Sequence, residues 1–254
     1  KQKTAYEILT CDWSSDVCSS DLYAVPMSPA PNEAGFNELN LDLAKLSTIF
    51  TAALASDCLD QLGAKNQVLK KDIEMISGEG VMLGFAFPVR MDVVDKAPEV
   101  PYVGLLKALD AIGKDQVFVS PANRLERAAL WGELLSTACK HKNVAGSLTD
   151  GQVRDVVRCR ALGFKVFGAG TLPLDINGRF EVVEHNVPCE IDGVKINPGD
   201  LIVGDIDGVV IVPKKLIAEV VRRVEEKNSG EDLFRKAVRE GMAPSEAFAK
   251  YKVL

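Results

Sequence analysis

Apolar residues first recur at a helical interval between residues 43 and 62. They fall three or four positions apart, at Leu43, Leu46, Ile49, Phe50, Ala53 and Leu54. This spacing places them on one face of a helix. Gly63 follows directly, and a glycine at that position commonly ends a helix. The pattern predicts one amphipathic helix over residues 43–62.

Strand-like and helix-like runs then alternate along the middle of the chain. Residues 81–94 are rich in Val, Phe and Met and predict a strand, residues 101–112 predict a helix, and residues 116–120 predict another strand. A further helix is predicted within residues 128–141. Alternation of this kind is typical of an α/β fold with a partly parallel sheet.

The stretch from residue 145 to residue 170 reads AGSLTDGQVRDVVRCRALGFKVFGAG. An apolar run ends at Thr149-Asp150-Gly151, a short helical pattern follows, Gly163 stops it, and a second apolar run begins. This order predicts a strand, a tight turn, a short helix and a strand. Arg154 and Asp155 are expected side by side in the first turn of that helix, with Asp150 as a turn residue or N-cap.

The pattern changes in the C-terminal half. Residues 180–213 form short Val/Ile-rich runs separated by turn signals such as Asp-Gly and Pro-Gly-Asp, which predict antiparallel hairpins. An apolar stripe from Leu216 to Val224 predicts a helix, Ser229 followed by Asp232 predicts the start of another, and residues 245–251 predict a last short one. The expected fold class is α/β with a mixed sheet, C-terminal hairpins and a helical tail.

The N-terminal segment is unlike the remainder of the chain. Residues 11–22 read CDWSSDVCSSDL, a Ser/Asp/Cys-rich run with no helix or strand period. It matches the translation of a common sequencing-library adapter, so we interpret residues 1–22 as an assembly artefact; an ordinary disordered leader is the alternative. We expect a leader over residues 1–35, a catalytic domain over residues 36–213 and a helical extension over residues 214–254, with Met27 as a candidate start.

Composition narrows the classes of protein to which the chain could belong. The formal net charge is −6 and no Lys/Arg cluster is evident, which weighs against a nucleic-acid partner. No apolar run approaches the roughly 18–20 residues of a membrane span, and we expect a cytoplasmic protein. Outside the adapter-like run the cysteines form no C-x-x-C pair, which argues against a structural zinc site.

Two predicted helix starts suggest a binding site for an anion. The first backbone N–H groups of a helix lack helical acceptors and favour carboxylates. One start covers Gly132, Glu133, Leu134 and Leu135, and the other precedes Arg154 and Asp155. Arg154 can bind a carboxylate through two hydrogen bonds. Asp155 can hold a hard cation such as Mg²⁺ or Mn²⁺ with water completing the shell. By spacing alone, a surface ion pair with a helix-start aspartate is the favoured interpretation of Arg154 and Asp155.

These residues resemble a known family. The runs Trp131-Gly132-Glu133-Leu134-Leu135, Asp150-Gly151-x-x-Arg154-Asp155 and Gly163-Phe164-x-Val166-Phe167 are similar to those of the RraA-like proteins. That group contains the regulator of ribonuclease E activity A and the 4-hydroxy-4-methyl-2-oxoglutarate aldolases. The resemblance covers residues 43–213 and implies a layered β/β/α core assembled as a homotrimer or homohexamer with sites between subunits.

The resemblance also implies an activity, a divalent-metal-dependent class II aldolase that cleaves 4-hydroxy-2-oxo acids or diacids to pyruvate and decarboxylates oxaloacetate. It assigns Mg²⁺ or Mn²⁺ to Asp155 and the pyruvyl carboxylate to Arg154 and the backbone of Gly132 to Leu135. Glu133 lies near enough in sequence to assist proton transfer, although an ordinary first-turn glutamate is an equal interpretation. Two alternatives stay open, namely a non-catalytic regulator that binds a ribonuclease and a lyase for sugar-derived 2-oxo acids.

Overall fold

The computed structural model describes residues 39–70, 72–125 and 127–253. The leader expected over residues 1–35 lies outside these ranges. The helical tail predicted from residue 214 is described, but its separation from the catalytic domain stays a prediction. Within the described ranges, no helix is both long enough and apolar enough to cross a membrane.

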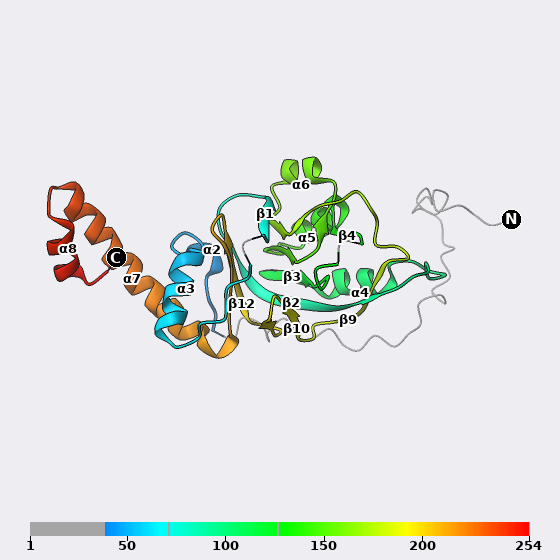
Figure 1. Cartoon of the computed structure of the whole chain (residues 1–254), viewed down its shortest axis with the longest axis horizontal. Helices are drawn as coiled ribbons and strands as arrows, with labels where there is room; N and C mark the ends of the chain where they lie inside the picture. Colours follow the sequence, from blue (N-terminus) through cyan, green and yellow to red (C-terminus); the bar gives the residue numbers. More distant parts are fainter. Residues whose placement is uncertain (1–38, 71, 126, 254) are drawn as a thin grey trace. The chain divides into compact units, whose positions relative to one another are not determined.

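An eight-stranded mixed sheet lies at the centre of the protein (Figure 1). Neighbouring strands follow the order β1-β7-β5-β3-β2-β12-β13, and β9 pairs with the C-terminal half of β2. In chain order, the first four strands of this sheet are β1 (Glu74–Ser77), β2 (Met82–Val93), β3 (Gln116–Ser120) and β5 (Gly146–Thr149). The others are β7 (Val166–Gly168), β9 (Phe180–His185), β12 (Leu201–Asp205) and β13 (Gly208–Val212). The strands β2, β3, β5 and β7 pair in parallel and the remaining pairs are antiparallel, which confirms the predicted mixed sheet.

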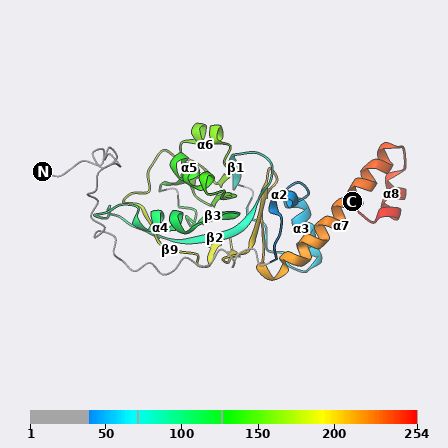
Figure 2. The same ribbon diagram turned by 180° about the vertical axis from the view of Figure 1, so that it is seen from behind.

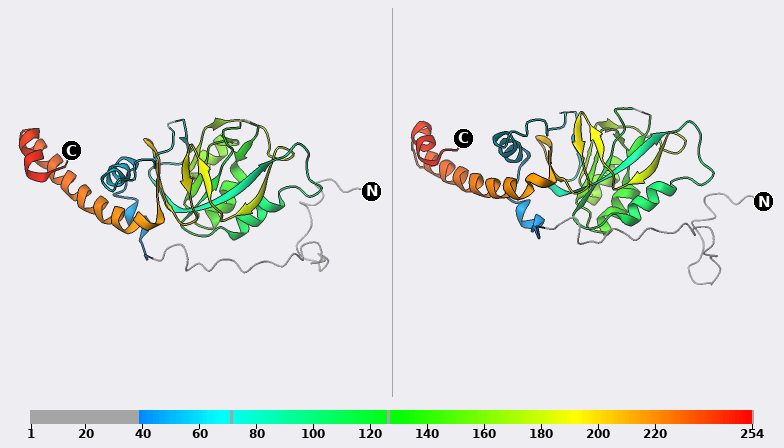
Figure 3. Two further views of the ribbon diagram at one scale, coloured as in Figure 1. Left: turned by 60° about the horizontal axis from the view of Figure 1, so that its bottom comes forward. Right: turned by 90° about the horizontal axis from the view of Figure 1, so that it is seen from below.

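The long strand β2 shows how the layers arise. Successive side chains of a strand point to opposite faces. Met82 and Ala86 therefore pack toward the hairpin of β10 (Cys189–Ile191) and β11 (Val194–Ile196). Phe87 and Val89 pack on the other face, in a core shared with three helices. The result is the layered β/β/α arrangement expected from the family resemblance, visible from behind in Figure 2 and from below in Figure 3.

Three helices cover the second face, namely α4 (Val103–Ala111), α5 (Glu133–His141) and α6 (Val156–Leu162). Helix α4 approaches β9 closely because Gly104 has no side chain, since a Cβ atom there would lie 1.6 Å from the carbonyl oxygen of Val182. This contact fixes the position of α4 and of the residue before it, Tyr102.

The prediction of a single helix over residues 43–62 is wrong. Helices α2 (Leu43–Leu46) and α3 (Ala52–Gln61) are separate. The helix is interrupted between α2 and α3 because two side chains bind the free backbone N–H groups at the start of α3. The Thr51 hydroxyl accepts from Leu54 N at 3.0 Å, and the Asp205 carboxylate accepts from Ala52 N at 2.7 Å. Asp205 comes from β12, so local spacing could not reveal this cap.

The C-terminal helices also differ from expectation. Ser229 does not begin a new helix but lies inside α7 (Ile217–Arg239), which follows a short 3-10 turn, η3 (Lys214–Leu216), and precedes α8 (Pro244–Tyr251). Its hydroxyl donates to Glu225 O one turn back. The first half of α7 buries Ile217, Val220 and Val224 against α3 and the sheet.

An ion-pair network joins the β10–β11 hairpin to the loop after β3. The side chain of Asp192 is 2% exposed and accepts hydrogen bonds from the Arg124 guanidinium and from Lys70 N at 3.1 Å. Arg124 also pairs with Asp72 at 2.7 Å. Burial alone would raise the pKa of Asp192, but the hydrogen bonds from Arg124 and Lys70 outweigh it and hold the pKa below its ordinary value.

We predict that Asp192→Asn lowers stability in a pH-dependent way. The native φ of +55° suits asparagine, so the change removes the charge and keeps the backbone. The free energy of unfolding should fall by about 3 kcal/mol at pH 7. A carboxylate whose folded pKa is lowered contributes its full stability above the unfolded pKa of about 4 and loses it as the pH falls through the folded pKa, so the difference between the two proteins should shrink progressively below about pH 4. Urea unfolding from pH 7 to pH 3 measures it, with Asp115→Asn, also at positive φ, as the control. An equal loss at every pH would contradict the ion-pair explanation.

Candidate functional site

A small parallel sheet brings the two predicted helix starts together. It consists of β4 (Ala129–Trp131), β6 (Gln152–Val153) and β8 (Gly170–Thr171), in that order. Strand β4 leads into α5 and β6 leads toward α6. Arg154 N donates to Trp131 O at 2.9 Å, directly after β6 and at the end of β4, just before each segment leaves the sheet toward its helix. Both helix starts therefore lie at the same end of this small sheet.

Gly132 provides the close contact between them. It is the N-cap of α5, in an extended conformation that any residue can adopt. A Cβ atom at this position would lie 3.1 Å from Arg154 Cγ and 3.2 Å from Asp155 Oδ2. The absence of a side chain therefore lets Arg154 and Asp155 lie against the start of α5.

Arg154 and Asp155 precede α6, so the prediction that they occupy its first turn is wrong. Pairing with β4 holds residues 152–153 in a strand, and Asp155, the N-cap, turns the chain through a φ of +56°. A positive φ is uncommon for a residue with a side chain and is often found at functional sites. Asp155 Oδ2 lies 3.6 Å from Arg154 Nε, and its side chain is 46% exposed.

The start of α5 is open to a ligand. No side chain caps it, and its first backbone N–H groups have no helical acceptor. Glu133 is half-buried, and its carboxylate accepts from Thr137 Oγ1 at 2.8 Å. Leu134 is 74% exposed, and Leu135 is half-buried.

A cavity of about 370 Å³ contains all of these groups. Its charged lining consists of Glu133, Arg154, Asp155 and Asp175. Helices α4 and α5 and the strand β4 supply most of the apolar lining, which includes Leu105, Leu106, Leu109, Leu130, Trp131, Leu134, Leu135 and Ala138. The six residues predicted to form the site, at positions 132–135, 154 and 155, therefore share one concave surface.

Two polar residues of this cavity, Tyr102 and Asp175, lie outside the motifs that predicted the site. Asp175, in the loop after β8, places Oδ1 3.0 Å from Arg154 Nη1. Tyr102, directly before α4, donates its hydroxyl to the same carboxylate. Burial and this hydrogen bond raise the pKa of Tyr102 to about 12. Burial tends to raise the pKa of Asp175, but hydrogen bonds from Tyr102 and Asn177 N, together with Arg154, lower it overall.

Asp150 is an anchor beneath the site. Its side chain is buried and accepts from the backbone N–H groups of Ala122 and Arg124. Burial raises its pKa. It is therefore a turn residue, as predicted, and its contacts tie the β5–β6 turn to the loop after β3.

The donor chemistry fits a weakly held, hard divalent cation. The described residues contain no cluster of three or more His, Cys, Asp or Glu side chains, so a metal held at Asp155 would take most of its ligands from water and substrate. Mg²⁺ and Mn²⁺ accept such oxygen-rich sites. Three carboxylates against one guanidinium give the described lining an excess of negative charge, which favours a cation. The described lining also contains no lysine.

Relatives by sequence and a solved structure resemble this chain. The chain is 29% identical over 206 residues to a Halalkalibacterium halodurans protein named "Putative 4-hydroxy-4-methyl-2-oxoglutarate aldolase", covering 81% of this chain and 92% of the relative. It is 28% identical over 200 residues to protein DlpA of Legionella pneumophila, but spans only 32% of that longer protein.

Among solved structures, Streptomyces coelicolor RraAS2, an unusual member of the RNase ES inhibitor RraA protein family, matches with a TM-score of 0.68 at 26% identity, over 76% of this chain and 96% of that one. The family model RraA-like, described as Aldolase/RraA, matches residues 51–211. That match includes β4, β6, α5 and the residues of the cavity from position 102 to position 176. The chain belongs to the RraA-like family.

Proposed function

We propose that the protein is a divalent-metal-dependent carbon–carbon lyase. It cleaves 4-hydroxy-2-oxo acids to pyruvate and a carbonyl product and decarboxylates oxaloacetate. The observation that carries this proposal is the position of Arg154 and Asp155 against the open N-terminus of α5, in one cavity. The family and the name of the Halalkalibacterium relative support the same reaction class.

Arg154 binds the carboxylate of the 2-oxo acid in this proposal. Its side chain is 35% exposed, and one guanidinium edge is held by Asp175 at 3.0 Å. The free N–H groups at the start of α5 can bind an anion in the same cavity. A charged donor and a helix N-terminus thus converge on one carboxylate.

Asp155 holds the metal in this proposal. Because Gly132 has no side chain, the Asp155 carboxylate can lie against the start of α5. When bound, Mg²⁺ or Mn²⁺ supplies the Lewis acid that stabilises an enolate. The lack of a lysine in the described lining is consistent with this assignment rather than with a Schiff base.

The bond changes require one further proton acceptor. In the retro-aldol reaction the C3–C4 bond breaks, its electron pair forms the C2–C3 enolate, and the C4 hydroxyl loses its proton. The C3 carbon is then protonated to give pyruvate. Glu133 lines the cavity, and the Thr137 hydroxyl holds one of its oxygens. We assign it an assisting role in this proton transfer.

The rim of the cavity favours assembly of several copies. Leu134, which lines the cavity on α5, is 74% exposed, and Val157 on α6, which packs against α5, is 82% exposed. Exposed apolar side chains that gather on one surface can mark a protein interface. We propose a homotrimer or homohexamer in which a neighbouring copy covers this rim and contributes an acidic group.

A ribonuclease-binding regulator is the second candidate. The similarity to RraAS2, whose family is named for RNase ES inhibition, supports it. A pull-down with the degradosome ribonuclease separates the two candidates, because specific binding without lyase activity would favour the regulator. A third candidate, a lyase for a sugar-derived 2-oxo acid, differs only at the distal end of the substrate.

We predict that Asp155→Asn abolishes metal-dependent activity. Asparagine tolerates the positive φ, so the turn into α6 is retained and the anionic ligand is lost. Pyruvate release should fall at least about 100-fold, and EDTA should inhibit the unmodified protein, with recovery on addition of Mn²⁺. Asp115→Asn, also at positive φ but on the turn before β3, is the control. Activity that survives either the mutation or the chelator would exclude the proposed mechanism.

Arg154→Lys should mainly weaken substrate binding. Lysine keeps the charge but loses the planar fork that binds a carboxylate through two bonds. KM should rise about tenfold or more, with a smaller change in kcat. Steady-state kinetics with oxaloacetate measure this, and Arg158→Lys on the exposed face of α6 is the control. An unchanged KM would show that Arg154 does not bind the carboxylate.

Gly132→Ala should impair activity without unfolding the protein. The added methyl group meets Arg154 and Asp155 at 3.1–3.2 Å and displaces them by a few tenths of an ångström. We expect kcat/KM to fall about tenfold while the thermal unfolding midpoint changes little. Gly113→Ala is the matched control, because its Cβ atom would meet only Gln116 Oε1 at 3.8 Å. Wild-type kinetics for Gly132→Ala would argue against close apposition in the active form.

A further inference from the structure

Asp175 holds the guanidinium that the proposed function assigns to the substrate carboxylate. Its Oδ1 atom lies 3.0 Å from Arg154 Nη1, whereas the carboxylate of Asp155 lies 3.6 Å from Arg154 Nε. Both contacts are ion pairs without the alignment of a hydrogen bond. The N–H groups of Arg154 can therefore still donate to a ligand while the charge of Asp175 restrains the guanidinium.

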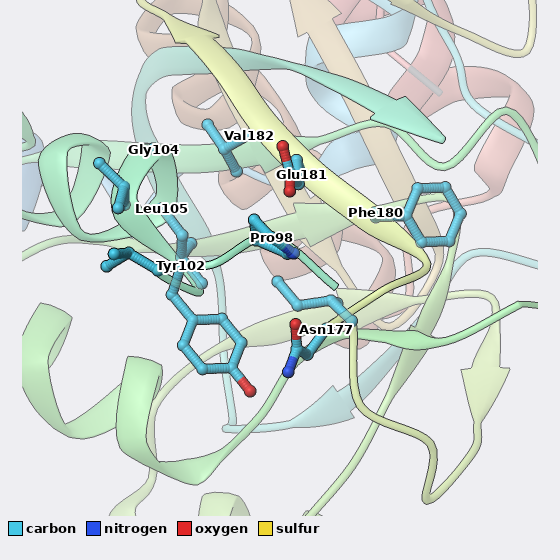
Figure 4. Close-up of a pocket in the computed structure, with 11 residues that line it drawn as sticks. Pro98, Tyr102, Gly104, Leu105, Asn177, Phe180, Glu181 and Val182 are labelled. Atoms are coloured by element: carbon cyan, nitrogen blue, oxygen red, sulfur yellow. The ribbon is translucent and has the colours of Figure 1, made fainter. Parts of the chain in front are cut away.

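The Asp175 carboxylate is itself fixed by contacts within one chain. Its Oδ2 atom accepts from the Tyr102 hydroxyl and from Asn177 N at 3.2 Å. These two donors also line a neighbouring hollow of about 240 Å³ (Figure 4). The loop that carries Asp175 is held from another side, because Ala129 N donates to Leu174 O at 2.9 Å. The carboxylate therefore presents its other oxygen to the guanidinium from a defined position.

Tyr102 reaches this carboxylate from an uncommon backbone conformation. It directly precedes α4 with a φ of +64°, a value that bulky side chains rarely adopt. Gly104 fixes the helix against β9, since a Cβ atom there would lie 1.6 Å from Val182 O. Asp155, the proposed metal ligand, also has a positive φ, of +56°. Residues held in such conformations cluster at functional sites, which points to a role for Tyr102 beyond packing.

The restraint on Arg154 affects binding in two opposite ways. The Arg154 side chain is 35% exposed, and ordering a long, partly exposed side chain opposes the binding of a ligand. The ion pair with Asp175 orders the guanidinium before a substrate arrives. The same negative charge weakens the attraction between Arg154 and a substrate anion, although solvent screens this effect. Removal of the charge therefore weakens binding if orientation dominates and strengthens binding if charge dominates.

We propose that Asp175 and Tyr102 are positioning residues that orient the Arg154 guanidinium toward the 2-oxo carboxylate. Asp175 contacts the guanidinium, and Tyr102 acts through Asp175. This inference rests on the proposed function and adds two residues to its substrate-binding machinery. Every contact that carries it lies within one chain, so it does not depend on the groups that a neighbouring copy contributes.

Asp175→Asn tests the contact with Arg154. Two donors meet at Oδ2, from Tyr102 and Asn177, so the amide oxygen should occupy that position and the NH₂ group should face Arg154. The Kd of pyruvate, measured by calorimetry on the full chain with Mn²⁺, should rise at least about fivefold. The KM for oxaloacetate should rise by a similar factor, and kcat should change less than about twofold. Asp110→Asn, at an exposed position on α4, is the control.

Tyr102→Phe tests whether the hydroxyl acts through Asp175. It keeps the ring and the charge of Asp175, and it should raise the Kd of pyruvate about twofold to threefold. The double variant Tyr102→Phe/Asp175→Asn should bind pyruvate no more weakly than Asp175→Asn alone, because the two residues act in series. Tyr251→Phe on α8 is the control. Additive losses would contradict the role assigned to Tyr102.

The outcomes separate the inference from the proposed function. An unchanged or lower Kd in Asp175→Asn, with lyase activity retained, overturns the inference and leaves the function standing. Weaker pyruvate binding by Asp175→Asn, in a protein that cleaves no substrate, overturns the reaction while the positioning of Arg154 stands. A full chain that does not bind pyruvate overturns both. Should Asp175→Asn unfold, Tyr102→Phe decides, because an unchanged Kd in that variant overturns the inference.

Discussion

The parallel pairing of β4 with β6 is the constraint on which the cavity depends. Each strand is only two or three residues long, yet it sets where the next helix begins. The hydrogen bond from Arg154 N to Trp131 O, 2.9 Å long, fixes the register of the two strands. A slip of one residue would point Arg154 to the opposite face and separate it from the start of α5. Gly132 then determines how closely the two segments approach.

The second constraint is electrostatic. One guanidinium and three carboxylates line the cavity, and two of these carboxylates, of Asp175 and Asp155, lie 3.0 Å and 3.6 Å from the guanidinium of Arg154. Tyr102 and Asp175 reinforce it, because their hydrogen bond keeps the phenol protonated and the carboxylate ionised. Leucines of α4 and α5 form much of the apolar part of the same lining.

Sequence periodicity succeeded where neighbours along the chain decide the conformation. Residues 116–120 form β3 as expected, and the predicted strand over residues 81–94 matches β2 within a residue at each end. It failed where a distant side chain intervenes. Asp205 caps α3 across 153 positions and divides a helix that apolar spacing predicted as continuous. The spacing of Ser229 and Asp232 predicts a helix cap, but the Ser229 hydroxyl donates to Glu225 O within α7.

The candidate site shows the same division. The sequence by itself determined the candidate residues, because Gly132, Arg154 and Asp155 lie in short motifs next to predicted helix starts. Only the tertiary structure decided which groups share the cavity with them. Tyr102 and Asp175 are separated by 73 positions and hydrogen-bond because α4 packs on β9 and the loop before β9 returns past Arg154. Local spacing reports which face of an element a side chain occupies, whereas contacts between elements depend on how the whole core packs.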